Sequence, residues 1–132
     1  MKVLFVAGFG PISKDAAAAR RLYRDALGLP FKEDGDYLHS EEVAGVRHLA
    51  VWPLSQAAES CFGTSEWPQD LPTPQAWIEF DVDDVENATR ELQGQGYRIL
   101  VEARKEPWGQ IVTRLLGPEG VLVGVTFTPW MR

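Results

Sequence analysis

The residues most able to do chemistry lie in the middle of the chain, between Trp77 and Asp84, where large apolar residues alternate with carboxylates. Such alternation predicts a β-strand with two different faces, because successive side chains point to opposite sides of a sheet. Trp77, Glu79 and Asp81 would share one face. The other face would carry three residues that pack under a helix: Ile78, Phe80 and Val82. An indole and carboxylates on one face fit either a ligand pocket or a wetted surface.

Glu79 and Trp77 each have two interpretations. A carboxylate in a pocket could pair with a cationic ligand or act as a general base, whereas a carboxylate at a rim is simply hydrated. The Trp77 ring could stack on a planar or cationic ligand, or fill internal space. Glu79 is therefore a candidate for catalysis and for ligand binding, and Trp77 for ligand binding.

Three further residues on predicted strands are candidates for the same site. Arg114 would either form an ion pair with Glu79 or bind an anionic group of a ligand. Gly124 would leave room for a bulky ligand, or mark a close packing contact. His48 is either a buried, hydrogen-bonded imidazole or an acid–base or metal-binding group.

The remaining aromatic residues and the cysteine carry less information. Four tryptophans are candidates to close the mouth of a cavity or to form a subunit interface: Trp52, Trp67, Trp108 and Trp130. Trp67 stands out because it lies in the proline-rich connector. His39 is expected at the surface of a hairpin. Cys61 is the only cysteine, which excludes an intrachain disulfide and is typical of a reducing cytoplasm.

Composition excludes several classes of partner. Of the 132 residues 45% are hydrophobic, enough for one folded domain spanning residues 1–132. The formal net charge of −6 argues against nucleic acid and anionic membranes, and is compatible with a cationic small ligand. No apolar run approaches the length of a membrane span. We therefore expect a cytoplasmic protein with a small-molecule partner.

The chain contains the same order of elements twice. Ser13 or Asp15 would cap a helix that runs to Leu27, and Asp83 begins a second helix that runs to about Leu92. Short strands are expected between residues 31 and 54, with the last from Val46 to Trp52. After the second helix, strands are expected at 97–103, 110–116 and 121–128. The predicted fold is α+β, with two βαβββ modules (about 1–55 and 76–132, joined by a linker at about 56–75) that form one curled mixed sheet around a concave cavity, with helices outside.

Three segments in this order resemble the vicinal oxygen chelate superfamily, which includes glyoxalase I, extradiol dioxygenases and the fosfomycin and bleomycin resistance proteins. The segment 21–29 resembles the family's first helix, which ends in Leu-Gly. The strand 78–84 resembles its mid-chain strand, and Pro107-Trp108-Gly109 with the turn 117–120 resembles its closing motifs. The resemblance covers nearly the whole chain.

The resemblance implies a divalent metal site, and its three ligand positions fall on Gly8, Trp77 and Gly124. None of these residues can ligate a metal through its side chain. The resemblance therefore favours the metal-free branch of the family, with no cofactor and with a homodimer as the expected assembly.

Three hypotheses follow for function. The first is a metal-free binding protein that holds a bulky or planar ligand in an aromatic and acidic cavity, as bleomycin resistance proteins do. The second is a lyase, isomerase or dioxygenase-like enzyme in which Glu79 or His48 acts as acid and base, or in which His48, Glu79 and Glu102 bind a metal. The third is an interaction module without a pocket.

Overall fold

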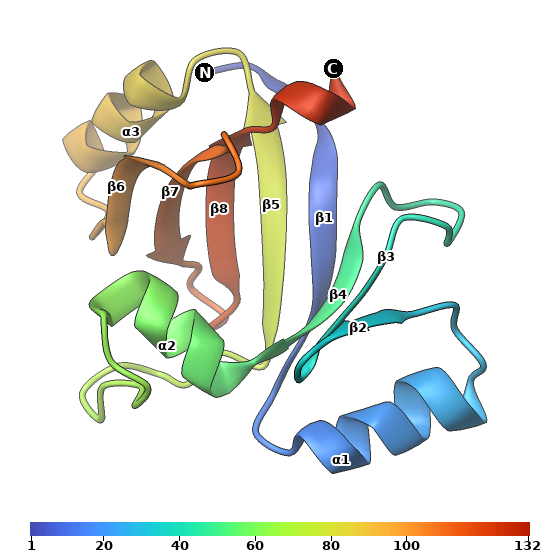
Figure 1. The fold of residues 1–132 in the computed structure, drawn as a ribbon. Helices are drawn as coiled ribbons and strands as arrows, with labels where there is room; N and C mark the ends of the chain where they lie inside the picture. The colour runs from blue at the N-terminus through green and yellow to red at the C-terminus, as the bar shows by residue number, and fades with distance from the viewer.

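Two copies of one unit, a strand followed by a helix and three more strands, account for most of the chain (Figure 1). The computed structural model describes all residues, 1–132. The first unit contains β1 (Val3–Ser13), α1 (Ala16–Ala19), the π-helical η1 (Arg20–Ala26), β2 (Lys32–Asp34), β3 (Tyr37–Ser40) and β4 (Leu49–Pro53). The second contains β5 (Ala76–Val82), α3 (Val85–Gly94), β6 (Val101–Lys105), β7 (Ile111–Leu116) and β8 (Leu122–Phe127). Helix α2 (Leu54–Phe62) joins the units, and the 3₁₀-helix η2 (Pro129–Met131) ends the chain.

The eight strands form one sheet in the order β2-β3-β4-β1-β5-β8-β7-β6. The first strands of the two units, β1 and β5, pair antiparallel at the centre, and each pairs in parallel with the last strand of its own unit. The sheet curls around a concave face (Figure 1). The predicted α+β fold with two βαβββ units is confirmed.

The first helix is wound differently from the expected α-helix. Asp15 caps it as predicted by accepting a hydrogen bond from the Ala18 amide at 3.0 Å. Beyond Ala19 the helix becomes π-helical, and the Leu27 amide bonds to the carbonyl of Leu22, five residues back. A π-helical turn is wider than the 3.6-residue turn of an α-helix, so its side chains point in directions different from those that an α-helix would give. Ala19 packs against Leu38 of β3 and Val51 of β4, whereas Leu22 and Leu27 are exposed.

The connector between the units contains a helix that the sequence analysis did not predict. Helix α2 follows Pro53 and ends at Gly63, whose φ of 76° lies in the left-handed region that favours glycine. Ala57 and Cys61 of α2 pack on the concave face of the sheet, against a cluster that includes Val112 and Leu122. Its buried residues are small, so the apolar face was not evident from hydrophobic periodicity.

The central strand β5 has the two faces that its alternation predicted. Val82 packs with Val85 and Ala88 of α3, whose capping residue is Asp84, one residue after the predicted Asp83. Ile78 and Phe80 share the convex face but are only half-buried, so the expectation that all three lie under a helix holds for Val82 alone. Strand β6 begins at Val101, later than predicted, because the turn at Gln95 and Gly96 is followed by a segment without regular structure.

Asp81 lies on the concave face but does not reach a cavity, because the C-terminal segment covers it. Its carboxylate accepts hydrogen bonds from the hydroxyl groups of Thr126 (2.5 Å) and Thr128 (2.8 Å) and from the Thr128 amide (2.8 Å). The Arg132 guanidinium is 3.2 Å from the same carboxylate. Asp81 thus shares the face of Trp77 and Glu79 as predicted, but it lies neither in the cavity nor at a wetted surface: it anchors the end of the chain to β5.

None of the helices combines the length and apolar composition needed to span a bilayer.

We expect Asp81→Asn to destabilise the fold. An amide at this position places N–H groups against donors that need an acceptor, so the free energy of unfolding should fall by about 2–3 kcal/mol. Urea unfolding measures the change. Asp70→Asn, at an exposed position, serves as the control and should change stability by less than about 0.5 kcal/mol. Equal stability of the two variants would contradict an anchoring role for Asp81.

Candidate functional site

A cavity of about 1000 Å³ opens on the concave face of the sheet, between α2 and the C-terminal segment. Four of the five tryptophans line it, as do several charged residues. The residues that matter for its chemistry are Tyr37, His48, Trp52, Ser60, Trp77, Glu79, Arg104, Glu106, Trp108, Gln110, Arg114 and Trp130.

The centre of the cavity floor is a carboxylate between two glycines. Across β1, β5 and β8, Glu79 pairs with Gly8 on one side and with Gly124 on the other. A Cβ atom at Gly124 would lie 2.9 Å from Glu79 Cγ, and one at Gly8 would lie 2.9 Å from Trp77 Cη2. The glycines thus make room for the two larger side chains to lie against the sheet. Gly124 itself does not line the cavity, which favours the packing interpretation over direct ligand contact.

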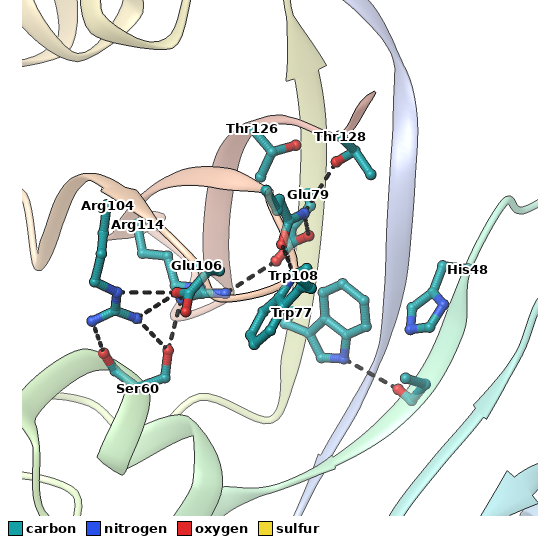
Figure 2. Close-up of polar contacts among 12 residues, drawn as sticks. His48, Ser60, Trp77, Glu79, Arg104, Glu106, Trp108, Arg114, Thr126 and Thr128 are labelled. Carbon is teal, nitrogen blue, oxygen red and sulfur yellow. Dashed lines mark hydrogen bonds and ion pairs between the residues drawn. The ribbon is translucent and has the colours of Figure 1, made fainter. Parts of the chain in front are cut away.

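Glu79 is held by partners inside the protein (Figure 2). Its Oε2 is 3.3 Å from Arg114 Nη2, and its Oε1 accepts a hydrogen bond of 3.1 Å from Gln110 Nε2. The Glu79 and Arg114 side chains are 14% and 6% exposed, so the pair is largely removed from water. Of the two interpretations of Arg114, the structure shows the ion pair.

A second set of polar contacts ties Arg114 to α2. Its Nη1 donates to Ser60 Oγ at 2.7 Å, and the carboxylate of Glu106 is 3.9 Å from the same nitrogen. Arg104, from β6, donates to the carbonyl and hydroxyl of Ser60 and to Glu106 (Figure 2). The network joins α2, β5, β6 and β7 into one rigid wall.

The tryptophans of the cavity differ in what they can offer a ligand. Trp77 is 5% exposed, and its Nε1 donates to the Ala50 carbonyl at 3.1 Å, so it mainly fills the space above the glycines of β1. The Trp52 ring meets Trp77 edge to face, and the Arg114 guanidinium lies 5.1 Å from its centre. Trp108 and Trp130 are more than half exposed at the cavity mouth.

His48 lies on the other side of Trp77 from the Glu79 network (Figure 2). Its Nε2 is 2.7 Å from the Tyr37 hydroxyl, and its Nδ1 is 2.8 Å from Glu41 Oε1. Burial, together with the charge of Glu79, raises the pKa of Tyr37, so this phenol stays protonated. Although burial opposes ionisation of Glu41, hydrogen bonds from His39 and His48 hold its pKa below the ordinary value.

Two sequence-based candidates, Trp67 and Glu102, do not belong to the cavity, and neither does the single cysteine. Trp67 does not line it: the ring packs against Phe62 and donates to the Pro72 carbonyl at 3.0 Å. Glu102 lies on β6 at the edge of the sheet and contacts Gln93 of α3, so the proposed metal set of His48, Glu79 and Glu102 does not converge. Cys61 is buried in the core beneath α2, where burial raises its pKa and opposes a nucleophilic role.

Sequence reasoning missed several residues of the site. Ser60 lies on the helix that was not predicted, and Arg104, Glu106 and Gln110 come from a strand and a turn whose faces could not be assigned without the register. Tyr37 could have been found, because it alternates with His39 on a predicted hairpin strand.

The comparisons with known proteins agree with this architecture. The model of the Glyoxalase/Bleomycin resistance protein/Dioxygenase superfamily matches residues 9–125. A member of that superfamily from Vibrio splendidus 12B01 is similar in structure, with a TM-score of 0.58 and 14% identity over 93% of this chain and 97% of that one. No curated protein matches the chain.

Two enzymes are also among the similar structures. A variant of Streptomyces coelicolor methylmalonyl-CoA epimerase in complex with 2-nitronate-propionyl-CoA has a TM-score of 0.55 and 17% identity, over 97% of this chain and 96% of that one. An NAD-dependent benzaldehyde dehydrogenase from Legionella pneumophila has a TM-score of 0.56 and 13% identity, over 90% and 96%. At these identities the likeness shows the fold alone.

The residues on the cavity floor do not fit the divalent metal that the resemblance implies. Gly8 and Gly124 offer no donor, and the indole nitrogen of Trp77 is a hydrogen-bond donor without a lone pair for a metal. Glu79, which lies between Gly8 and Gly124, is the only carboxylate among these floor residues. Both of its oxygens are already bound by Arg114 and Gln110. The Arg114 guanidinium supplies the positive charge that this carboxylate needs.

We expect Arg114→Met to destabilise the protein by about 3–5 kcal/mol, because it leaves Glu79 buried beside a neutral side chain. Adding Glu79→Gln should restore much of that loss, since no unpaired charge then remains. Urea unfolding of the two single variants and the double variant gives the coupling energy. Additive effects would show that the two side chains do not interact.

Proposed function

Because the chain belongs to the Glyoxalase/Bleomycin resistance protein/Dioxygenase superfamily, we propose that it binds a planar, positively charged small molecule in the concave cavity, without a metal ion on the cavity floor. The observation that carries this proposal is the combination of aromatic walls with a floor carboxylate that already has its partners. Such a floor can interact with a ligand through its shape and charge. It has no unbound acid or base at its centre.

The charge of the cavity favours a cation. Four carboxylates line it, from Asp34, Glu59, Glu79 and Glu106, against the two guanidinium groups of Arg104 and Arg114. Both arginines are engaged with Glu79, Glu106 and Ser60, so neither is free to bind an anionic group. Acidic residues around a concave site attract cationic ligands.

The exposed indoles at the mouth favour a planar ligand. Trp108 and Trp130 are 59% and 58% exposed, and both line the cavity together with the less exposed Trp52. Aromatic rings gain several interactions from a flat cation: burial of apolar surface, stacking and attraction between charge and π-face. An acyl-CoA compound, as in the Streptomyces coelicolor epimerase structure, fits this cavity poorly because its phosphates would meet an excess of carboxylates.

We expect the protein to bind the planar cation proflavine and to bind the planar anion anilinonaphthalene sulfonate at least about tenfold more weakly. Trp108→Ala should weaken proflavine binding by roughly fivefold or more, because it removes one stacking surface from the mouth. Fluorescence titration measures both dyes. The protein is treated with a chelator first, and proflavine binding should persist.

Trp67→Phe is the matched control, since this indole packs against Phe62 away from the cavity. It should leave proflavine binding unchanged. Preference for the anion, or loss of binding after chelation, would overturn the proposed function.

A lyase, isomerase or dioxygenase-like enzyme is the alternative, and one observation favours its acid–base form. His48 faces the cavity and lies between Glu41 and the Tyr37 hydroxyl, an arrangement that orients an imidazole for proton transfer. Glu79 is the weaker candidate, because its oxygens are already engaged.

The acid–base alternative predicts that a bound carbonyl compound exchanges a proton with solvent. Exchange of deuterium from D₂O into simple 2-oxo acids, followed by NMR, should be at least about 100-fold faster with the wild type than with His48→Gln. Equal rates for the two proteins would exclude His48 as the acid or base for these compounds.

A further inference from the structure

Three metal-binding side chains converge beside the cavity, away from its floor. His39, at the end of strand β3, Glu41, just after it, and His48, just before β4, bring their donor atoms within 4.8 Å of one another. Both imidazoles turn their Nδ1 atoms toward the same oxygen, Glu41 Oε1, at 3.3 Å from His39 and 2.8 Å from His48. In a tetrahedral zinc site the donor atoms lie about 3.3 Å apart, so these separations suit a shared ion.

The hairpin holds the two imidazoles in place. The rings of Tyr37, His39 and His48 stack in one layer, with centres 5.5 to 6.2 Å apart. The antiparallel pairing of His39 with Ala50 sets His39 beside the start of β4, and Tyr37 follows from the alternation along β3. One donor of the set, His39, is therefore fixed within a strand, while Glu41 and His48 lie at the two ends of the loop that joins β3 to β4.

The Tyr37 hydroxyl serves as the outer partner that metal-binding histidines need. It lies 2.7 Å from His48 Nε2, the nitrogen that points away from Glu41. A hydroxyl can donate or accept, so it can accept Nε2–H when Nδ1 binds an ion and donate when Nδ1 carries the proton.

Access also suits a cation. The side chains of His39 and His48 are about a quarter exposed or less, while that of Glu41 is 47% exposed, so an ion can enter from solvent.

We infer that His39, Glu41 and His48 form a binding site for a divalent first-row metal ion of the zinc type. Zinc and the other divalent first-row metal ions coordinate imidazole nitrogens and carboxylate oxygens, whereas calcium and magnesium coordinate mostly oxygen. The site is separate from the floor row of Gly8, Glu79 and Gly124. Because Tyr37 and His48 also line the cavity, a bound ion would adjoin the space proposed for ligand.

The experiment is metal titration of tag-free protein that has been stripped with a chelator. Zinc should bind at one ion per chain, measured by isothermal titration calorimetry, and cobalt should give the strong visible absorption of a tetrahedral site. His39→Ala and Glu41→Gln should each weaken zinc binding by at least about 100-fold. Tyr37→Phe, which removes only the outer partner, should weaken it about 10- to 100-fold.

Glu42→Gln is the matched control. It makes the same change of charge one residue away, at an exposed position whose side chain is not part of the group. It should leave zinc affinity unchanged, and circular dichroism should show that all the variants are folded. The inference is overturned if the wild type takes up no zinc, or if Glu41→Gln and Glu42→Gln behave alike.

The outcome is independent of the proposed function. Proflavine binding without zinc binding would overturn the metal site and leave the ligand cavity intact. Zinc binding without proflavine binding would overturn the proposed function and leave the metal site intact.

Discussion

The burial of two carboxylates on one face of β5 is the constraint on which the rest of the site depends. A buried carboxylate is costly unless charged or polar partners replace its water. Asp81 obtains its partners from Thr126, Thr128 and Arg132, and thereby fixes the C-terminal segment over one end of the concave face. Glu79 obtains its partners from Arg114 and Gln110, and thereby fixes the opposite wall. The space left between these two anchored regions is the cavity.

The same pairing decides what the cavity can do. With Glu79 bound to Arg114, and Arg114 bound in turn to Ser60 of α2, the floor is rigid and carries no unpaired charge. Selectivity must then come from the rim, where Trp108 and Trp130 are exposed and where carboxylates outnumber guanidinium groups. This division between a satisfied floor and an aromatic, acidic rim suits binding better than chemistry at the centre of the floor.

On the cavity floor, the positive charge beside Glu79 comes from an arginine side chain. A guanidinium cannot lose its proton at physiological pH and forms directed hydrogen bonds, so it balances Glu79 permanently. Glycines on both sides of Glu79 remove further donors and make room for the neighbouring side chains. The donors that do converge, His39, Glu41 and His48, are on the β3–β4 hairpin instead, where the proposed ion would lie at the edge of the cavity.

Much of the architecture follows from the sequence alone, because it rests on local patterns. Alternation in β5, the acidic capping patterns at Asp15 and Asp83 and the repeated order of elements predicted two βαβββ units, and motif resemblance identified the family. Helix α2 escaped prediction because its buried face consists of small residues such as Ala57. The site depended on tertiary structure. Strand register decides that Glu79 lies between two glycines. The C-terminal segment folds over Asp81 and buries it, and the packing of Trp67 against α2 keeps that ring outside the cavity. These outcomes depend on residues far apart in the chain, which no local pattern contains.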